Sequence, residues 1–368
     1  MNNKFKLLAY HLMQSSDIFY KMKCTIEGSM HHREANVLVH TYMVLNEYFD
    51  LTTHKWKLCD LEGAFACLFH DVGKPAAEVN KFSEERGHYH SYPGHELISA
   101  RIWENWAVEH YGILIYFFPC FNFQSIYNIG WMIEHHLPYD IKNKYKLECI
   151  YKTGKSIGEN TFTNVLLADG RGRINDNAEA QGIRQQTWLN AYTNYEGSPD
   201  VIIGDRHVHM IIGPSGVGKS TITNKLVNDC TPDVIAVFSL DKLRLDWYSD
   251  LLIMNPNEQY DYVHEAALSD PKFNGRWQRE YVNLVKSSVK MIIIDGTNLF
   301  TKHRRFFLDV ARNNDIVTHA VYLTSSLKIL EQRQNARTDK IVDMNIVKKQ
   351  YANIQYPSYN EFDVIHII

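Results

Sequence analysis

The feature that most constrains the fold of this chain is a glycine-rich stretch, GPSGVGKS, that runs from Gly213 to Ser220. The apolar run from Val208 to Ile212 before it is typical of a buried strand, and the run from Ser220 to Asn228 after it has helical periodicity. Glycines at this spacing let a loop turn tightly and direct its backbone N–H groups at one phosphate group. The segment therefore predicts a strand, a phosphate-binding loop and a helix, in that order.

The periodicity of the chain changes near residue 200. Up to about Asn194 the apolar side chains recur at helical spacing, so we expect an all-α region. After the loop-forming segment NYEGSP, residues 194–199, short β-rich runs alternate with helical patterns; the runs are HVHMII, VIAVFSL, MIIID, THAVYL and FDVIHII. This alternation predicts a parallel sheet covered by helices. We predict two domains, an all-α domain over residues 1–198 and an α/β domain over residues 199–368.

Composition limits the class of protein. The 6 cysteines follow no regular spacing, which indicates neither a disulfide framework nor a thiolate zinc site. The most apolar run, Tyr111 to Phe123, contains Pro119 and is too short to span a bilayer. We expect a cytoplasmic protein without a membrane partner. A net charge of −3 argues against a protein that coats long nucleic acid, but it permits a local basic patch that binds one strand end.

The residue types of the loop suit a nucleoside triphosphate with Mg²⁺. Lys219 is expected to reach the β- and γ-phosphates, and Ser220 to supply an oxygen to Mg²⁺. The residues expected around ATP, or another nucleoside triphosphate, are Gly213, Ser215, Gly216, Gly218, Lys219, Ser220 and Thr221. A loop of this type defines a superfamily, and it does not define a reaction.

Three polar clusters accompany the later strands. Asp241 and Arg244 follow the second strand, where a carboxylate can deprotonate a hydroxyl and a guanidinium can bind a phosphate, although DxxR is also a common surface ion pair. Asp295 closes the third strand at the ligand-binding edge of such a sheet. Arg333 and Arg337 are spaced by four, which places them on one helical face that could close over a triphosphate or simply face solvent.

These motifs resemble the bacteriophage-type 5′-polynucleotide kinase in order and spacing. The resemblance is carried by GPSGVGKS, LDKLR, DGTNL followed by HRR, and RQNAR followed by NIVKKQY, and it covers about residues 207–356. It implies a P-loop kinase domain with an arginine lid made by Arg333 and Arg337. It also implies that Lys219 acts on the donor phosphates, Asp241 is the general base and Arg244 binds the acceptor phosphate. Asp295 falls at another motif position of that family.

The first region carries polar residues on stripes that should be apolar. His40 lies in VLVHTYMVL, His70 ends AFACLFHD, and Asp169 continues the stripe of Phe162 and Leu166. A single buried histidine is most often a structural residue, but a buried carboxylate without a partner costs several kcal/mol. Metal ligation resolves that cost, because imidazole and carboxylate suit divalent transition metals or Mg²⁺.

This set resembles the HD phosphohydrolase superfamily, through His40, the doublet His70-Asp71 and Asp169, over about residues 30–173. HDVGKP followed by YPGHE is similar to the HD domains attached to tRNA nucleotidyltransferases. The resemblance implies one divalent ion held by His40, His70, Asp71 and Asp169. It implies a second held by Asp71, His95 and either His135 or His136. The expected ions are Mn²⁺, Ni²⁺, Co²⁺, Fe²⁺, Zn²⁺ or Mg²⁺. Lys74, Arg171 and Arg173 could contact substrate phosphate or be solvated surface.

Together the halves resemble HD-domain polynucleotide kinase-phosphatases, in which the kinase precedes the HD domain, the reverse of the order here. The resemblance implies healing of RNA or DNA strand ends in a bacterial or phage-infected cytoplasm, by 5′-hydroxyl phosphorylation with Lys219, Asp241, Arg244 and Arg337 as catalytic groups. It also implies hydrolysis of a 3′-phosphate or 2′,3′-cyclic phosphate with Asp71 as catalytic group, and a separate ligase that seals the ends. Two alternatives stay open: a nucleotide-salvage enzyme that joins an HD nucleotidase to a nucleoside kinase, and a regulatory protein that uses ATP as a switch.

Overall fold

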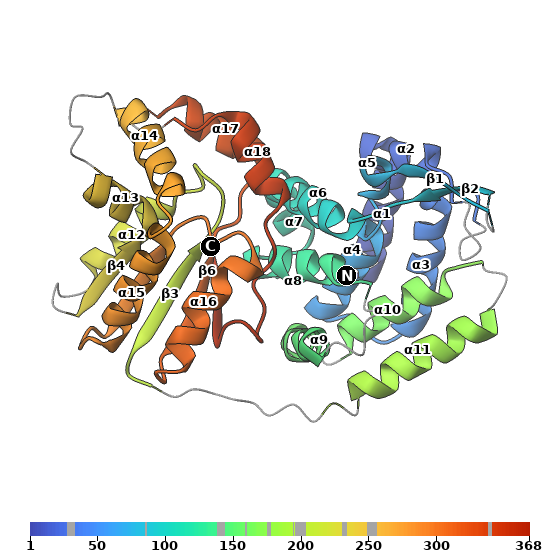
Figure 1. Ribbon diagram of the computed structural model, residues 1–368. Coiled ribbons are helices and arrows are strands. Elements are labelled where there is room, and N and C mark those ends of the chain that lie inside the picture. The colour runs from blue at the N-terminus through green and yellow to red at the C-terminus, as the bar shows by residue number, and fades with distance from the viewer. Residues whose placement is uncertain are drawn as a thin grey trace. The chain divides into compact units, whose positions relative to one another are not determined.

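The structure, a computed structural model, describes residues 1–27, 34–84, 87–137, 144–158, 160–174, 178–193, 195, 204–229, 234–248, 256–337 and 341–368. The chain folds as two compact units, Met1–Ser198 and Pro199–Ile368. Figure 1 colours the first unit from blue to green and the second from yellow to red. Apart from Tyr195, the segment predicted to join them lies outside the described residues.

The first unit is helical. Its helices are α1 (Asn2–Ser15), α2 (Asp17–Cys24), α3 (Val37–Leu51), α4 (Leu58–Phe69), α5 (Lys74–Ala77), α6 (His95–Glu109), α7 (Tyr111–Phe117), α8 (Phe123–Glu134), α9 (Lys144–Ile157), α10 (Thr161–Arg171) and α11 (Ala178–Thr193). Among the described helices of the whole chain, none combines the length and the apolar character needed to cross a bilayer.

Helix α4 is the centre of this unit. Every residue from Asp60 to Phe69 is buried, including the two carboxyl side chains of Asp60 and Glu62. Helices α3, α8 and α10 pack against it. Because α4 ends at Phe69 inside this packing, the polar doublet His70-Asp71 that follows it lies in the interior of the unit.

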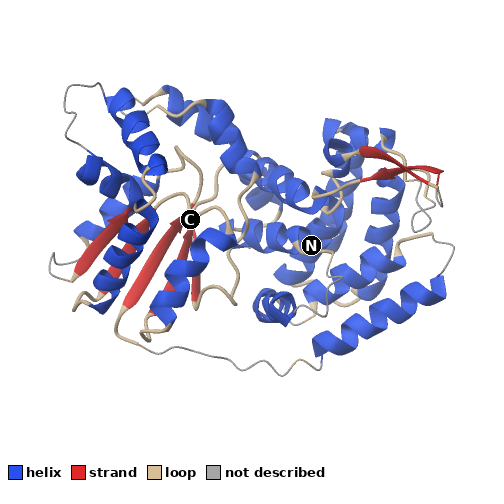
Figure 2. Cartoon of the chain, in the orientation of Figure 1, coloured by secondary structure: helices blue, strands red, loops and turns tan. Residues whose placement is uncertain are grey.

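The prediction of an all-α first region is wrong at one place. Strands β1 (Val79–Ser83) and β2 (Gly87–Ser91) form an antiparallel hairpin before α6, which Figure 2 shows in red. The side chains of β1 are mostly exposed, so the segment lacks the apolar alternation by which a strand is recognised in a sequence.

The second unit confirms the predicted α/β alternation. Its strands are β3 (His207–Ile212), β4 (Ile235–Ser239), β5 (Met291–Asp295), β6 (Val317–Tyr322) and β7 (Val364–Ile367). Its helices are α12 (Lys219–Asn228), α13 (Leu240–Tyr248), α14 (Pro256–Ser269), α15 (Phe273–Lys286), α16 (Thr301–Arg312), α17 (Leu327–Asn335) and α18 (Met344–Ala352).

The strands form a 5-stranded sheet in the order β4-β5-β3-β6-β7, and every pairing in it is parallel. Their carboxyl ends therefore meet at one edge, where open α/β sheets bind ligands. The glycine-rich loop follows β3 at this edge, Asp241 follows β4 there, and Asp295 is the last residue of β5 at the same edge.

Candidate functional site

Helices from distant parts of the first unit bring six polar side chains into its interior. His40 comes from α3, His70 and Asp71 from the end of α4, His95 from the start of α6, His136 from the chain just after α8, and Asp169 from α10. All six residues are buried. The side chains that the sequence analysis placed on apolar stripes are thus gathered in one place.

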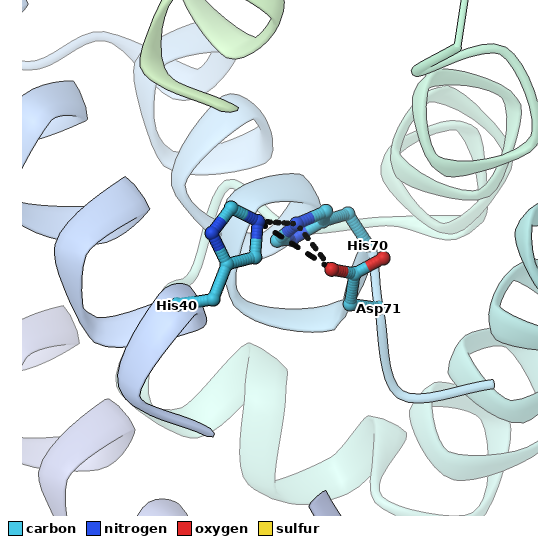
Figure 3. Close-up of side chains that lie close together, drawn as sticks. All are labelled: His40, His70 and Asp71. Carbon is cyan, nitrogen blue, oxygen red and sulfur yellow. Dashed lines mark hydrogen bonds and ion pairs between the residues drawn. The ribbon is translucent and has the colours of Figure 1, made fainter. Parts of the chain in front are cut away.

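The first group surrounds one oxygen of Asp71. His70 Nε2 lies 3.1 Å and His40 Nε2 3.5 Å from Asp71 Oδ2, and the two imidazole nitrogens are 3.3 Å apart (Figure 3). Asp169 Oδ1 lies 3.1 Å from His40 Nε2 and 3.6 Å from His70 Nε2. The four residues predicted to share an ion therefore do lie together.

The second group surrounds the other oxygen of Asp71. His95 Nε2 is 3.1 Å and His136 Nε2 is 3.7 Å from Asp71 Oδ1. Within each of the sets His40-His70-Asp71 and Asp71-His95-His136, the potential ligand atoms lie within 4.8 Å of one another. Asp71 thus belongs to both groups, with one oxygen directed to each.

Backbone carbonyl groups orient the four imidazoles. In each ring Nδ1 lies at hydrogen-bond distance from a carbonyl oxygen, so that Nδ1–H donates and Nε2 is left for the centre. For His40 the acceptor is Gly172 O, at 2.9 Å. A side chain on Gly172 would clash with the backbone of Val44, so glycine is what lets α10 end this close to α3. The other acceptors are Cys67 O for His70 at 2.8 Å, Tyr92 O for His95 at 2.7 Å and Ile133 O for His136 at 2.7 Å.

His135 lies outside both groups. Its ring stacks on Trp131, with the ring centroids 4.4 Å apart and an angle of 17° between the planes. Its Nδ1 lies 2.9 Å from Trp131 O. Of the two neighbouring histidines that the sequence left as alternatives, the structure brings His136 to Asp71.

Both buried carboxylates are held in the ionised form. Burial acts to raise the pKa of Asp71, but His70 and Lys74 outweigh it and hold the pKa well below its ordinary value. Burial likewise acts to raise the pKa of Asp169, and Arg173 holds it well below. Lys74 Nζ lies 2.8 Å from Asp71 Oδ2, and Arg173 forms an ion pair with Asp169. These two cations contact the carboxylates, whereas Arg171 is exposed.

The imidazoles differ in their charge. Burial acts to lower the pKa of His40, but hydrogen bonds to Asp169 and Glu34 raise it to about 9. Burial and the neighbouring rings of His70 and His95 lower the pKa of His136 to about 3. His136 is therefore neutral at pH 7, which is the form of histidine that binds metals.

The donor set fits divalent transition metals, which take imidazole nitrogen and carboxylate oxygen together. Two of the atoms, Asp71 Oδ1 and His95 Nε2, are buried and lie 3.1 Å apart, but within the part of the chain that the structure describes neither atom has a partner with the geometry of a hydrogen bond. Buried polar atoms in that condition cost free energy, and ligation to a cation satisfies both. The six residues are thus a possible metal-binding group, with Asp71 between two positions.

The second unit places the glycine-rich loop between β3 and α12. Gly216 and Gly218 have φ angles of 86° and 107°, a left-handed region that side chains rarely tolerate. Lys219 Nζ donates to the carbonyl oxygens of Pro214 at 2.8 Å and Gly213 at 3.2 Å, which folds the lysine over the loop. Ser220 and Thr221 lie in the exposed first turn of α12.

Asp241 and Arg244 form the ion pair that their spacing allows. Arg244 Nη1 donates to Asp241 Oδ1 at 2.7 Å, within the first turns of α13. Ser239 pairs with Asp295 in the β4-β5 register, so both carboxylates leave the sheet at the same edge. The side chain of Asp241 is 45% exposed, so it is accessible to an acceptor from solvent.

The two arginines that were predicted to form a lid, Arg333 and Arg337, do not share a helical face. Arg333 lies in the last turn of α17, and its Nη1 donates to Val217 O at 2.5 Å. Helix α17 ends at Asn335, so Arg337 lies beyond the helix and the prediction from its spacing is wrong. Arg333 nevertheless contacts the glycine-rich loop.

Three residues near the loop were missed by the sequence analysis. Gln350 Oε1 accepts from Ser215 N at 2.8 Å, and the buried Gln334 lies beside Gly216. Asn298 adopts a φ of 46°, and its Nδ2 donates to Ile211 O at 2.8 Å, which ties the end of β5 to β3. Each of the three lies in a motif quoted in the sequence analysis, Asn298 in DGTNL, Gln334 in RQNAR and Gln350 in NIVKKQY, and could have been found there.

Comparison with known proteins agrees with this kinase-like site. Residues 208–357 match the family described as an AAA domain. The chain is similar to the probable gluconokinase of Schizosaccharomyces pombe, with 23% identity over 163 residues, which cover 44% of this chain and 79% of that protein. The second unit is an α/β, kinase-like P-loop domain, and such a domain implies ATP or another nucleoside triphosphate with Mg²⁺.

Proposed function

We propose that the protein heals the broken ends of RNA or DNA strands. The second unit phosphorylates a 5′-hydroxyl with ATP, and the first hydrolyses a 3′-phosphate or 2′,3′-cyclic phosphate. The observation that carries the hydrolytic half is Asp71, whose two carboxylate oxygens each face a separate pair of imidazole nitrogens. The finished ends would then suit a separate ligase.

The kinase half of the proposal rests on residues at the carboxyl edge of the sheet in the second unit. Backbone N–H groups of the loop and Lys219 hold the donor phosphates, and Ser220 binds Mg²⁺. Asp241 accepts the proton of the attacking hydroxyl, while Arg244, which is already oriented by Asp241, binds the neighbouring phosphate of the strand. Arg333 and Arg337 stabilise the charge that develops on the transferred phosphoryl group.

The hydrolytic half uses the buried groups of the first unit. Divalent ions, when bound there, would polarise the phosphate and activate a water molecule. Asp71 holds the two histidine pairs side by side, and the carbonyl contacts of the four imidazoles fix the direction of each Nε2. Lys74 offsets part of the negative charge of Asp71, and the site therefore repels an anionic substrate less strongly.

A second candidate is a kinase for a small hydroxyl compound. The similarity to a probable gluconokinase favours it, because that protein's name indicates a sugar-acid acceptor. A nucleotide-salvage enzyme belongs to the same class, since its acceptor is also a single small molecule. These activities differ from end healing in one respect, which is that a strand of several nucleotides would be a poor acceptor.

One assay separates these functions. An RNA oligonucleotide with a 5′-hydroxyl and a 3′-phosphate is incubated with the full chain, ATP, Mg²⁺ and Mn²⁺, and both termini are read by mass spectrometry. End healing predicts gain of the 5′-phosphate and loss of the 3′-phosphate. Gluconate and free nucleosides are tested in parallel. Phosphorylation of one of these, with no change at either RNA end, would contradict the proposal.

A further inference from the structure

A strip of cationic and aromatic side chains continues from Asp241 and Arg244 along helix α13. The guanidinium of Arg244 lies 5.5 Å from the ring centroid of Phe273, at the start of α15. The indole of Trp247 lies 5.7 Å from the same ring at an angle of 74°. Phe273 is buried and touches both side chains, so Arg244 and Trp247 lie on one face of α13.

Arg276 extends this strip from the neighbouring helix. Its guanidinium carbon lies 3.9 Å from the ring centroid of Trp247, which is the distance of a stacked cation–π contact. Arg276 is exposed and Trp247 is partly exposed, so the stack reaches solvent. Asp270 lies close to this stack: its Oδ2 accepts from the Tyr248 hydroxyl at 2.7 Å, its Oδ1 accepts from Lys272 N at 2.8 Å, and the charge of Arg276 is among the causes that lower the pKa of its carboxyl.

We propose that Trp247 and Arg276 form a subsite for the base of the nucleotide that follows the 5′-terminal one in an acceptor strand. Stacked indole and guanidinium planes match a flat nucleobase, and such contacts accept any base. Asp241 and Trp247 are separated by about 9 Å along the helix axis. A strand of two or more nucleotides spans that length, whereas a sugar acid has neither the length nor a planar ring. This inference rests on the kinase half of the proposed function and specifies its acceptor.

The test compares two acceptors and three variants of the full chain. The acceptors are a 5′-hydroxyl RNA hexamer and a nucleoside 3′-monophosphate, which cannot reach the subsite. The variants are Trp247→Leu and Arg276→Met, with Arg279→Met as control, because Arg279 is an exposed arginine of the same helix. We expect Trp247→Leu and Arg276→Met to raise the KM for the hexamer by about tenfold, and to leave kcat and the KM for the mononucleotide unchanged. Arg279→Met should resemble the wild type.

An equal rise in KM for both acceptors would show that Trp247 and Arg276 only support the fold. An unchanged KM for both acceptors would show that no base stacks on these two side chains. Both results overturn the inference. A second readout, the fluorescence anisotropy of a labelled single-stranded RNA, keeps the two proposals apart. If RNA binds and Arg276→Met weakens it about tenfold while no phosphate is transferred, the subsite stands and the assigned reaction fails. If the wild type phosphorylates RNA but the two variants behave like it, the reaction stands and the subsite fails.

Discussion

His135 and His136 are adjacent in the chain, but they have different surroundings. The Nε2 of His136 faces Asp71 Oδ1, while the ring of His135 stacks on Trp131. We expect His136→Ala to weaken the binding of one of two Mn²⁺ ions by at least about tenfold, because a ligand is removed. His135→Ala, the matched control, should keep both ions. Calorimetric titration of the purified chain with Mn²⁺ checks this, and equal affinities for the two variants would rule out the assignment of His136.

The buried position of a polar residue could be predicted where that residue lies on an otherwise apolar helical stripe. His40, His70 and Asp169 lie on apolar stripes, which predicted that they are buried, and the resemblance to HD phosphohydrolases implied that they meet. The choice between His135 and His136 could not be made, because it depends on how the chain leaves α8 at the C-cap His135. The position of Arg337 was wrong for a similar reason, since the spacing argument assumes a helix that in fact ends at Asn335. Helix ends are where a spacing argument loses its geometric basis.

Three neighbouring strands carry a histidine cluster on one face of the sheet. His207 and His209 of β3 lie beside His319 of β6, and His319 lies beside His366 of β7. His207 Nδ1 is 3.0 Å from His319 Nε2, and His319 Nδ1 is 3.1 Å from His366 Nε2. Burial and the neighbouring rings lower the pKa of His209 to about 3 and that of His319 to about 4. These rings are therefore neutral in the folded protein near pH 7.

This cluster makes the stability of the sheet depend on pH. In the unfolded chain the same histidines titrate near 6.5, so below that pH the unfolded state binds more protons than the folded state. Stability is full above pH 6.5 and falls as the pH drops toward 3. We measure amide hydrogen exchange of β3 and β6 and correct it for the intrinsic exchange rate at each pH. We expect the population of the open state to be about tenfold larger at pH 5 than at pH 7. His319→Gln should show a smaller change, and an identical change in both proteins would contradict the explanation.

Strands were predictable to the extent that their side chains are buried. The runs that became β3 and β5 are apolar because the sheet is covered, and they stood out in the sequence. The hairpin of β1 and β2 did not, because none of its side chains is buried and they show no apolar alternation. The ties between Gln350 and Ser215 and between Asn298 and Ile211 join residues far apart in the chain, so no local pattern shows them.

At the scale of the whole molecule, each compact unit contains its own candidate site. The histidine and aspartate groups come from helices of Met1–Ser198, and the glycine-rich loop, Asp241 and Arg333 come from Pro199–Ile368. Neither set contains a residue of the other unit. The two activities of the proposed function should therefore respond to separate substitutions, since each set of charges acts within its own unit.

We expect Lys219→Ala to lower 5′ phosphorylation of RNA by about 100-fold or more, because the donor phosphates lose their only loop lysine, and to leave 3′ hydrolysis intact. Asp71→Asn should do the reverse, since it removes the charge shared by both histidine groups while keeping the size of the side chain. Both variants are assayed at both termini of one RNA, with circular dichroism as the check of folding. A mixture of the two folded variants should heal both ends, because each supplies the site that the other lacks. Loss of both activities in either folded variant would show that the sites depend on one another and would contradict this division of the reaction.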